Sequence, residues 1–382
     1  MRLLSCESPL IGASRTGRWT ALLLIFSFAA LSMTGIVRAQ TPMAGVGTSS
    51  PFVETEAGRN DAPIPVELPR DDAPHDVGIE WWYYTGHLFT DSGERYGFEY
   101  VIFKGHRGDV LGYAAHFAIT DNPRGVFRYD QRLGLAPETP LAAKGFDLRV
   151  GDWQMIGSDG TDHLVASMPG YGIDLSLRST KPAALHDGDG YFDYGSGEGS
   201  YYYSRTRLAI SGTLTVDGPP RAVVGEAWFD HQWGNFSTYM GGWDWYALQL
   251  DNETEVMLYI IHGPDGGPLI VDGSFIAADG TLTVLDRGDF TLTPTGSWTS
   301  PHSAATYPSS WNVVLPAQHL ALTLSPSMPD QELDTTASTS VIYWEGEVTV
   351  AGTHSGQLIT GLGYVELTGY AKTGQPKATP SP

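Results

Sequence analysis

Short runs of aromatic and branched aliphatic residues alternate with clusters of Gly, Asp, Asn and Pro along most of the chain. The runs recur at intervals of about ten residues, which is typical of strands in antiparallel sheets and barrels. No apolar stripe with helical spacing is long enough to predict a substantial helix. The pattern therefore predicts an all-β fold. The predicted strands are 79–89, 95–104, 114–120, 146–150, 163–167, 172–177, 201–206, 208–216, 221–228, 244–250, 255–262, 271–277, 318–324, 341–350 and 361–367.

One segment of sequence is echoed in the second half of the chain. Residues 78–83 (GIEWWY) precede a turn and an apolar run at 98–103, and residues 241–246 (GGWDWY) precede a turn and a similar run at 256–261. The echo predicts that each segment starts the first hairpin of a β-barrel, so that two barrels follow in tandem. We place the domains at 66–238 and 239–372. A chance match of two Trp-rich strands is the alternative.

The two ends of the chain lack this alternation. Arginines precede an apolar run at 19–37 that leads to Ala39, which predicts a signal peptide over residues 1–39, cleavage near Ala39, and a periplasmic or secreted protein. The run is long enough for a retained membrane anchor, which is the alternative. Residues 40–65 are rich in Pro and Gly and are interpreted as a linker, and residues 373–382 as a disordered tail.

Composition excludes several kinds of chemistry. The formal net charge of −21 makes nucleic acid a poor partner. The only cysteine, Cys6, lies in the predicted signal peptide, so disulfides, thiolate metal sites and a cysteine nucleophile are excluded from the mature protein. The sequence motifs of serine hydrolases, zinc proteases, dinucleotide-binding folds and P-loops are absent. The histidines are scattered singly, so we predict neither a metal site nor a cofactor.

The densest polar and aromatic cluster is residues 225–234 (GEAWFDHQWG). Strand alternation puts Asp230 on one face and His231 and Trp233 on the other. A carboxylate beside an imidazole can tune its basicity, and an indole face can stabilise a developing cation, so the cluster suits proton transfer to an alkene. The alternative is that the cluster only closes the core of a barrel.

A second set of residues suits an apolar ligand. Glu80, Trp82 and Tyr84 share one face of the first predicted strand, and Trp243 and Trp245 flank Asp244 in the echoing strand. Such rings can line the mouth of a barrel, although rings on strands also fill ordinary cores. Tryptophans beside carboxylates are typical of glycosidases too, so a glycoside-directed hydrolase or binding module stays open as an alternative.

Several motifs together resemble one known family. They are 78–86 (GIEWWYYTG), 115–121 (AHFAITD), 225–234 (GEAWFDHQWG), 242–250 (GWDWYALQL), 343–348 (YWEGEV) and 363–370 (GYVELTGY). Over roughly residues 66–372 the chain resembles the AttH and carotenoid 1,2-hydratase family. The resemblance implies two tandem lipocalin-like barrels. Some members add water across an isoprenoid double bond without a cofactor, and others are cyclisation catalysts in fungal pathways.

The resemblance also implies roles for individual residues. His231 and Trp233 fall on the His and Trp of the hydratase motif, and Tyr259 falls on its Tyr. The hydratases carry an Asp two residues after that Tyr, where this chain has Ile261. Asp230 and Asp244 are therefore the candidates to replace the missing proton donor.

These observations predict an exported protein that holds a hydrophobic small molecule where its two barrels meet. Hydration of a C=C bond is the predicted activity if the protein is catalytic. A non-catalytic accessory protein that works beside a membrane transporter is the second hypothesis, and a glycoside-directed protein is the third.

Overall fold

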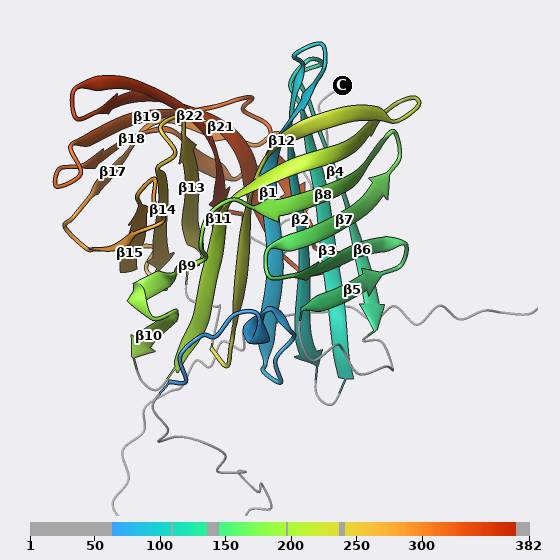
Figure 1. Cartoon of the computed structure of the whole chain (residues 1–382), viewed down its shortest axis with the longest axis horizontal. Helices are drawn as coiled ribbons and strands as arrows, with labels where there is room; N and C mark the ends of the chain where they lie inside the picture. Colours follow the sequence, from blue (N-terminus) through green and yellow to red (C-terminus); the bar gives the residue numbers. More distant parts are fainter. Residues whose placement is uncertain (1–62, 108–109, 136–144, 196–197, 237–240, 372–382) are drawn as a thin grey trace, which may run out of the picture.

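The fold is all-β, and two antiparallel sheets are each curled into a barrel. A computed structural model describes residues 63–107, 110–135, 145–195, 198–236 and 241–371. The barrels lie side by side, the first coloured blue to yellow-green and the second olive to red (Figure 1). In the described ranges the helical segments are two short 3-10 turns, η1 (Arg70–Asp72) and η2 (His186–Gly188). The predicted pair of tandem lipocalin-like barrels is thereby confirmed.

The first barrel is one sheet in the order β4-β3-β2-β1-β12-β11-β8-β7-β6-β5, with β9 and β10 also paired to β11. Its first strand pairs with its last, and β4 approaches β5 at the open edges of the sheet. The strands are β1 (Ile79–Thr90), β2 (Arg95–Arg107), β3 (Val110–Asp121), β4 (Val126–Leu135), β5 (Phe146–Val150), β6 (Trp153–Ser158), β7 (Thr161–Met168), β8 (Tyr171–Ser179), β9 (Ala184–Leu185), β10 (Tyr191–Gly195), β11 (Glu198–Val216) and β12 (Arg221–Gly234).

The second barrel repeats this plan in the order β16-β15-β14-β13-β22-β21-β19-β18-β17, with β20 paired to β21. Its first strand again pairs with its second and its last, so the echoed segments do start the first hairpin of each barrel. The strands are β13 (Trp243–Leu250), β14 (Glu255–His262), β15 (Pro268–Ile276), β16 (Leu282–Asp286), β17 (Thr291–Thr299), β18 (Thr306–Leu315), β19 (Leu320–Pro326), β20 (Glu332–Asp334), β21 (Ile342–His354) and β22 (Gln357–Leu367).

The strands where the barrels meet are buried on both faces. In β1, Trp82 and Tyr84 point into the core of the first barrel, while Tyr83 packs against Trp245 of the second barrel. A strand that is covered on both sides needs apolar or aromatic residues at nearly every position. This explains why β1 and β13 are rich in aromatic and apolar residues and are buried at nearly every position, whereas β5 at the outer wall alternates between buried and exposed residues.

Each predicted strand corresponds to an observed one, but several strands were missed. The predicted strands 201–206 and 208–216 form one long strand, β11, whose register shifts between Arg205 and Leu208. The missed strands include β4 and β17, because their residues are mostly polar or exposed and β17 contains Pro294 and Gly296. In the described part of the chain no helix is long and apolar enough to cross a membrane.

Several predictions fall on residues outside the described ranges. They are the signal peptide, most of the linker, the disordered tail and the domain boundary between residues 238 and 239. Within the described ranges, the first sheet runs from Ile79 to Gly234 and the second from Trp243 to Leu367.

Candidate functional site

A cavity of about 1060 Å³ lies between the two barrels. The outward faces of β1, β2 and β12 line one side of it, and those of β13, β14 and β22 line the other. Strand pairing brings the lining residues together. Tyr83 of β1 is opposite Asp230 of β12, and Trp245 of β13 is paired with Tyr259 of β14 on one side and Glu366 of β22 on the other. The cavity therefore exists only because both barrels are present.

Aromatic rings from both barrels line the wall. Tyr83 meets Trp245 edge-on with ring centroids 5.2 Å apart, and Trp228 meets the same indole edge-on at 6.2 Å. Such a wall suits an apolar or ring-bearing molecule. The rings that line the cavity are Trp81, Tyr83, Phe103, Tyr113, Tyr194, Tyr202, Phe236, Trp243, Trp245, Tyr259 and Tyr343.

Asp230 is a buried acid of this cavity with three hydrogen-bond donors. Its side chain is only 3 % exposed and accepts hydrogen bonds from Tyr202 Oη at 2.6 Å, from Trp228 Nε1 at 2.6 Å and from Ser204 Oγ. All three donors are neutral, and together they offset only part of the loss of water around the carboxylate. Burial therefore raises the pKa of Asp230 to about 7, although the three hydrogen bonds oppose the rise.

A chain of hydrogen bonds continues behind Asp230. Ser204 Oγ lies 2.6 Å from His186 Nε2, and His186 Nδ1 lies 2.9 Å from Ser274 Oγ of the second barrel. Burial lowers the pKa of His186 to about 3, so its imidazole is neutral and has one proton to donate. The chain fixes the Ser204 hydroxyl beside Asp230 and ties the two barrels together.

Three more carboxyl groups gather near the cavity, of which Glu99 and Glu345 are buried and Glu366 is half-buried. Burial raises the pKa of Glu366 to about 7, while a 3.0 Å bond from Trp243 Nε1 opposes the rise. Burial, and then the charge of Glu366, raise the pKa of Glu99 well above its ordinary value. Burial also raises the pKa of Glu345, which is paired with Glu366 across β21 and β22 and accepts a 2.7 Å bond from Tyr83 Oη. The cavity is thus bordered by carboxyl groups that favour their neutral form.

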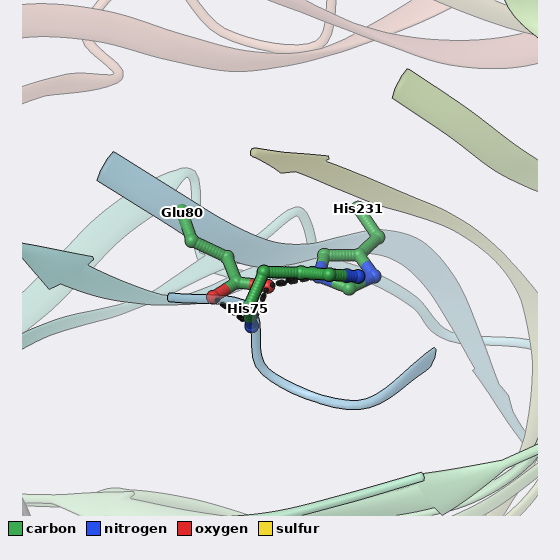
Figure 2. A group of neighbouring side chains, drawn as sticks. All are labelled: His75, Glu80 and His231. Carbon is green, nitrogen blue, oxygen red and sulfur yellow. Dashed lines mark hydrogen bonds and ion pairs between the residues drawn. The ribbon is translucent and has the colours of Figure 1, made fainter. Parts of the chain in front are cut away.

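A separate polar group closes the end of the first barrel. Figure 2 shows His75 and His231 directed at the carboxylate of Glu80, with Nδ1 of His75 at 2.7 Å and Nε2 of His231 at 2.9 Å from Oε1. Lys104 Nζ donates to the other oxygen at 2.9 Å. Burial alone would raise the pKa of Glu80, but these hydrogen bonds and charges lower it to about 2. Trp233 stacks on the His75 ring at 4.1 Å.

Two histidines and a glutamate are ligand types that bind zinc. Both nitrogen-to-oxygen separations, however, are ordinary hydrogen-bond lengths. The Lys104 ammonium also places a positive charge against the same carboxylate. We therefore interpret the group as a hydrogen-bonded brace between the His75 loop, β1, β2 and β12.

The residues predicted for the site lie in three places. Asp230, Trp243, Trp245 and Tyr259 line the cavity between the barrels, as does Ile261, the position where hydratases carry an Asp. His231, Trp233, Glu80, Trp82 and Tyr84 lie inside the first barrel. Asp244 faces the second barrel, where it accepts a 2.9 Å bond from Tyr370 and lies 3.1 Å from His262. Their catalytic and ligand-binding roles stay predictions.

Sequence reasoning missed two acids of the cavity, Glu99 and Glu366. Each is a lone carboxylate in an otherwise apolar strand, Phe98–Phe103 in one case and GYVEL in the other. A charged residue in a strand that is buried on both faces is costly unless it has a function or a partner. The energetic cost of burying these two carboxylates was therefore the feature of the sequence that could have identified them.

Comparisons with known proteins agree with this architecture. A kievitone hydratase from Fusarium solani subsp. phaseoli is 23% identical over 303 residues, which cover 75% of this chain and 81% of that protein. The crystal structure of kievitone hydratase from Nectria haematococca superimposes with a TM-score of 0.65 at 20% identity, over 80% of this chain and 93% of that chain, which shows a shared fold.

A candidate AttH protein from Nitrosomonas europaea is more similar. Its crystal structure matches with a TM-score of 0.74 and 30% identity, over 81% of this chain and 98% of that chain. The AttH-like family pattern matches residues 59–370, which include both barrels and the cavity between them. The chain therefore belongs to the AttH-like family.

Proposed function

We propose that the cavity between the barrels binds an apolar small molecule that contains a C=C bond, and that Asp230 protonates this bond in a hydration reaction without a cofactor. The observation that carries the proposal is a buried carboxyl group with a pKa of about 7 in an aromatic-walled cavity. Near neutral pH, such a group is protonated in a large fraction of molecules and is acidic enough to give its proton up.

The residues of the cavity account for each step. The Asp230 carboxyl transfers its proton to one carbon of the double bond, which leaves a carboxylate and a carbocation. The faces of Trp243 and Trp245 stabilise the cation. Water then adds to the cationic carbon, and its surplus proton returns to Asp230, so the carboxyl group is restored.

The hydrogen bonds to Asp230 help its carboxylate to regain the proton. Tyr202 receives a 3.0 Å hydrogen bond from Trp245 Nε1, so its own hydroxyl proton is directed at Asp230. The donors hold the carboxylate in place after proton transfer but supply no full positive charge. The carboxylate therefore remains basic enough to recover a proton.

Relatives support the class of reaction. One relative is a kievitone hydratase, and its match extends over most of this chain. Ile261 replaces the Asp of the hydratase pattern, and Asp230 lines the same cavity. Of the two candidates to replace that Asp, we favour Asp230, because it lines the cavity and Asp244 faces the second barrel.

The test is turnover in water enriched in oxygen-18. Purified protein is incubated with kievitone, other prenylated aromatic compounds and linear polyenes, and mass spectrometry detects products that have gained one labelled water. Asp230→Asn keeps the shape of the side chain and removes the acid, so we expect at least about a hundredfold loss of rate.

The matched control is Glu226→Gln. Glu226 is on the same strand, but its carboxylate pairs with Arg207 at 2.5 Å and does not line the cavity. We expect this variant to keep its rate. Full turnover by Asp230→Asn would refute the proposed acid, and binding without labelled product across the whole panel would favour a non-catalytic binding protein.

We also propose that the protein acts after export, because the pattern of residues 1–39 is that of a signal peptide. Mass spectrometry of the protein isolated from its host should then find a mature N-terminus near Gln40 in the extracytoplasmic fraction. An intact Met1 in the cytoplasmic fraction would contradict this.

A further inference from the structure

The charged groups of the cavity are almost all of one sign. Asp230, Glu99 and Glu366 line it, and no arginine is among its described lining residues. Lys104 is the single lysine there, and its ammonium group is already bonded to the Glu80 carboxylate at 2.9 Å. The cavity therefore offers an incoming ligand no uncommitted positive charge in the described ranges.

Several acceptor atoms in and beside the cavity lack donors. Glu99 is 1 % exposed, and neither of its carboxyl oxygens makes a well-formed hydrogen bond, although the Tyr343 hydroxyl is near enough to lower its pKa slightly. The second oxygen of Glu345 is also buried without a partner. Unsatisfied buried acceptors are costly, and a ligand that brings a donor would satisfy them.

Three donors of the wall are already used. Trp243 Nε1 donates to Glu366, Trp245 Nε1 donates to Tyr202, and Tyr83 Oη donates to Glu345. The wall therefore presents ring faces and the oxygens of Glu99 and Glu366, and a cation beside these oxygens would favour the charged form of the two carboxyl groups over the neutral form that burial favours. An anionic ligand would meet buried carboxyl groups with no cation to offset its charge.

We propose that the cavity between the barrels recognises apolar molecules that carry a positive charge, with Glu99 and Glu366 as the acceptors and the tryptophan faces as the surrounding wall. An organic ammonium ion would bind more tightly than its neutral counterpart, and a carboxylate of the same skeleton would be rejected. The inference rests on the proposed function only in taking this cavity as the ligand site. It also fits the proposed reaction, since a stable cation resembles the carbocation formed on protonation.

The test compares three molecules that share one skeleton: phenylbutylamine, phenylbutanol and phenylbutyrate. Isothermal titration calorimetry at pH 7 and displacement of the neutral dye Nile red give their affinities for the full mature protein. We expect the amine to bind at least about tenfold more tightly than the alcohol, because a hydrogen bond to a charged group exceeds a neutral one by about that factor. The carboxylate should bind at least about tenfold more weakly than the alcohol.

Variants assign the preference to named residues. Glu99→Gln should lower the affinity for the amine about tenfold and leave the affinity for the alcohol unchanged. Glu366→Gln tests the same point if the first variant does not fold. The control is Asp174→Asn, since Asp174 is an exposed acid of β8 that pairs with His163 and does not line the cavity. It should not alter the order of the three affinities.

The inference is overturned if the amine binds no more tightly than the alcohol, if the carboxylate binds as well as either, if none of the three binds, or if the preference survives in both Gln variants. These results differ from failure of the proposed reaction. Loss of turnover in Asp230→Asn together with equal affinities would leave hydration standing and remove cation recognition. A clear amine preference with unchanged turnover in Asp230→Asn would leave cation recognition standing and remove Asp230 as the acid of the hydration reaction.

Discussion

Asp230→Asn should make the stability of the protein depend less on pH. In the native state, burial raises the pKa of Asp230 from 3.8 to about 7. Because the raised pKa favours the protonated form, the native state keeps this proton at pH values where the unfolded chain has already lost it. The contribution of Asp230 to stability is therefore fully present below about pH 4 and is lost as the pH rises through 7.

The size of the effect follows from this shift. Each pKa unit corresponds to about 1.4 kcal/mol. At pH 5 the Asp230 carboxyl is already largely ionised in the unfolded state but is still protonated in the native state. By pH 8 it is largely ionised in both states. Linkage then predicts that wild type loses about 2.5 kcal/mol more unfolding free energy over this range than Asp230→Asn does. The difference between the two proteins isolates Asp230 from the other buried acids.

Guanidinium unfolding followed by far-ultraviolet circular dichroism, at pH 5 and at pH 8, measures this difference. Glu226→Gln is again the control, because Glu226 is on the same strand with its carboxylate at Arg207. It should follow the wild-type pH dependence. If Asp230→Asn loses as much stability as wild type between pH 5 and pH 8, Asp230 is ionised in the native protein and the argument for a proton donor fails.

Three further substitutions test other parts of the structure. Tyr202→Phe removes a hydrogen bond that lowers the pKa of Asp230, so the pKa of Asp230 should rise. The pH profile of turnover, or the pH at which the carboxyl infrared band of Asp230 disappears, should then move to higher pH. His231→Ala removes a donor from the buried carboxylate of Glu80 and should lower the unfolding free energy by about 2 kcal/mol, measured by guanidinium unfolding. Trp245→Ala removes one wall of the cavity and should weaken Nile red binding about tenfold, measured by fluorescence titration.

The sequence predicted the fold more fully than the site. Period-two alternation correctly separated Trp81 and Tyr83 from Trp82 and Tyr84 on β1. It did not show which of these faces meets the second barrel, because both are aromatic. The sequence analysis therefore places the ligand at the face of Trp82. In the structure, Trp82 fills the core of the first barrel, and Trp81 and Tyr83 line the cavity.

The acids of the cavity were harder to predict because they come from both barrels. Glu99 of β2 and Glu366 of β22 are far apart in the sequence, and the charge of Glu366 acts on Glu99 only once the barrels pack together. Strand alternation describes one sheet at a time. The contact between two sheets is tertiary information, and no local pattern in a single sequence contains it.

Two carboxyl groups on the paired strands β1 and β12 show why we propose the cavity, and not the end of the first barrel, as the reactive place. Both Glu80 and Asp230 are buried and hydrogen-bonded. Glu80 faces the Lys104 ammonium and two imidazoles, and its pKa falls to about 2, so it stays charged and serves as a brace. Asp230 receives hydrogen bonds from neutral groups alone, and its pKa rises to about 7. The hydrogen bonds and charges that oppose desolvation, more than the degree of burial, thus decide which carboxyl can exchange a proton with a ligand at neutral pH.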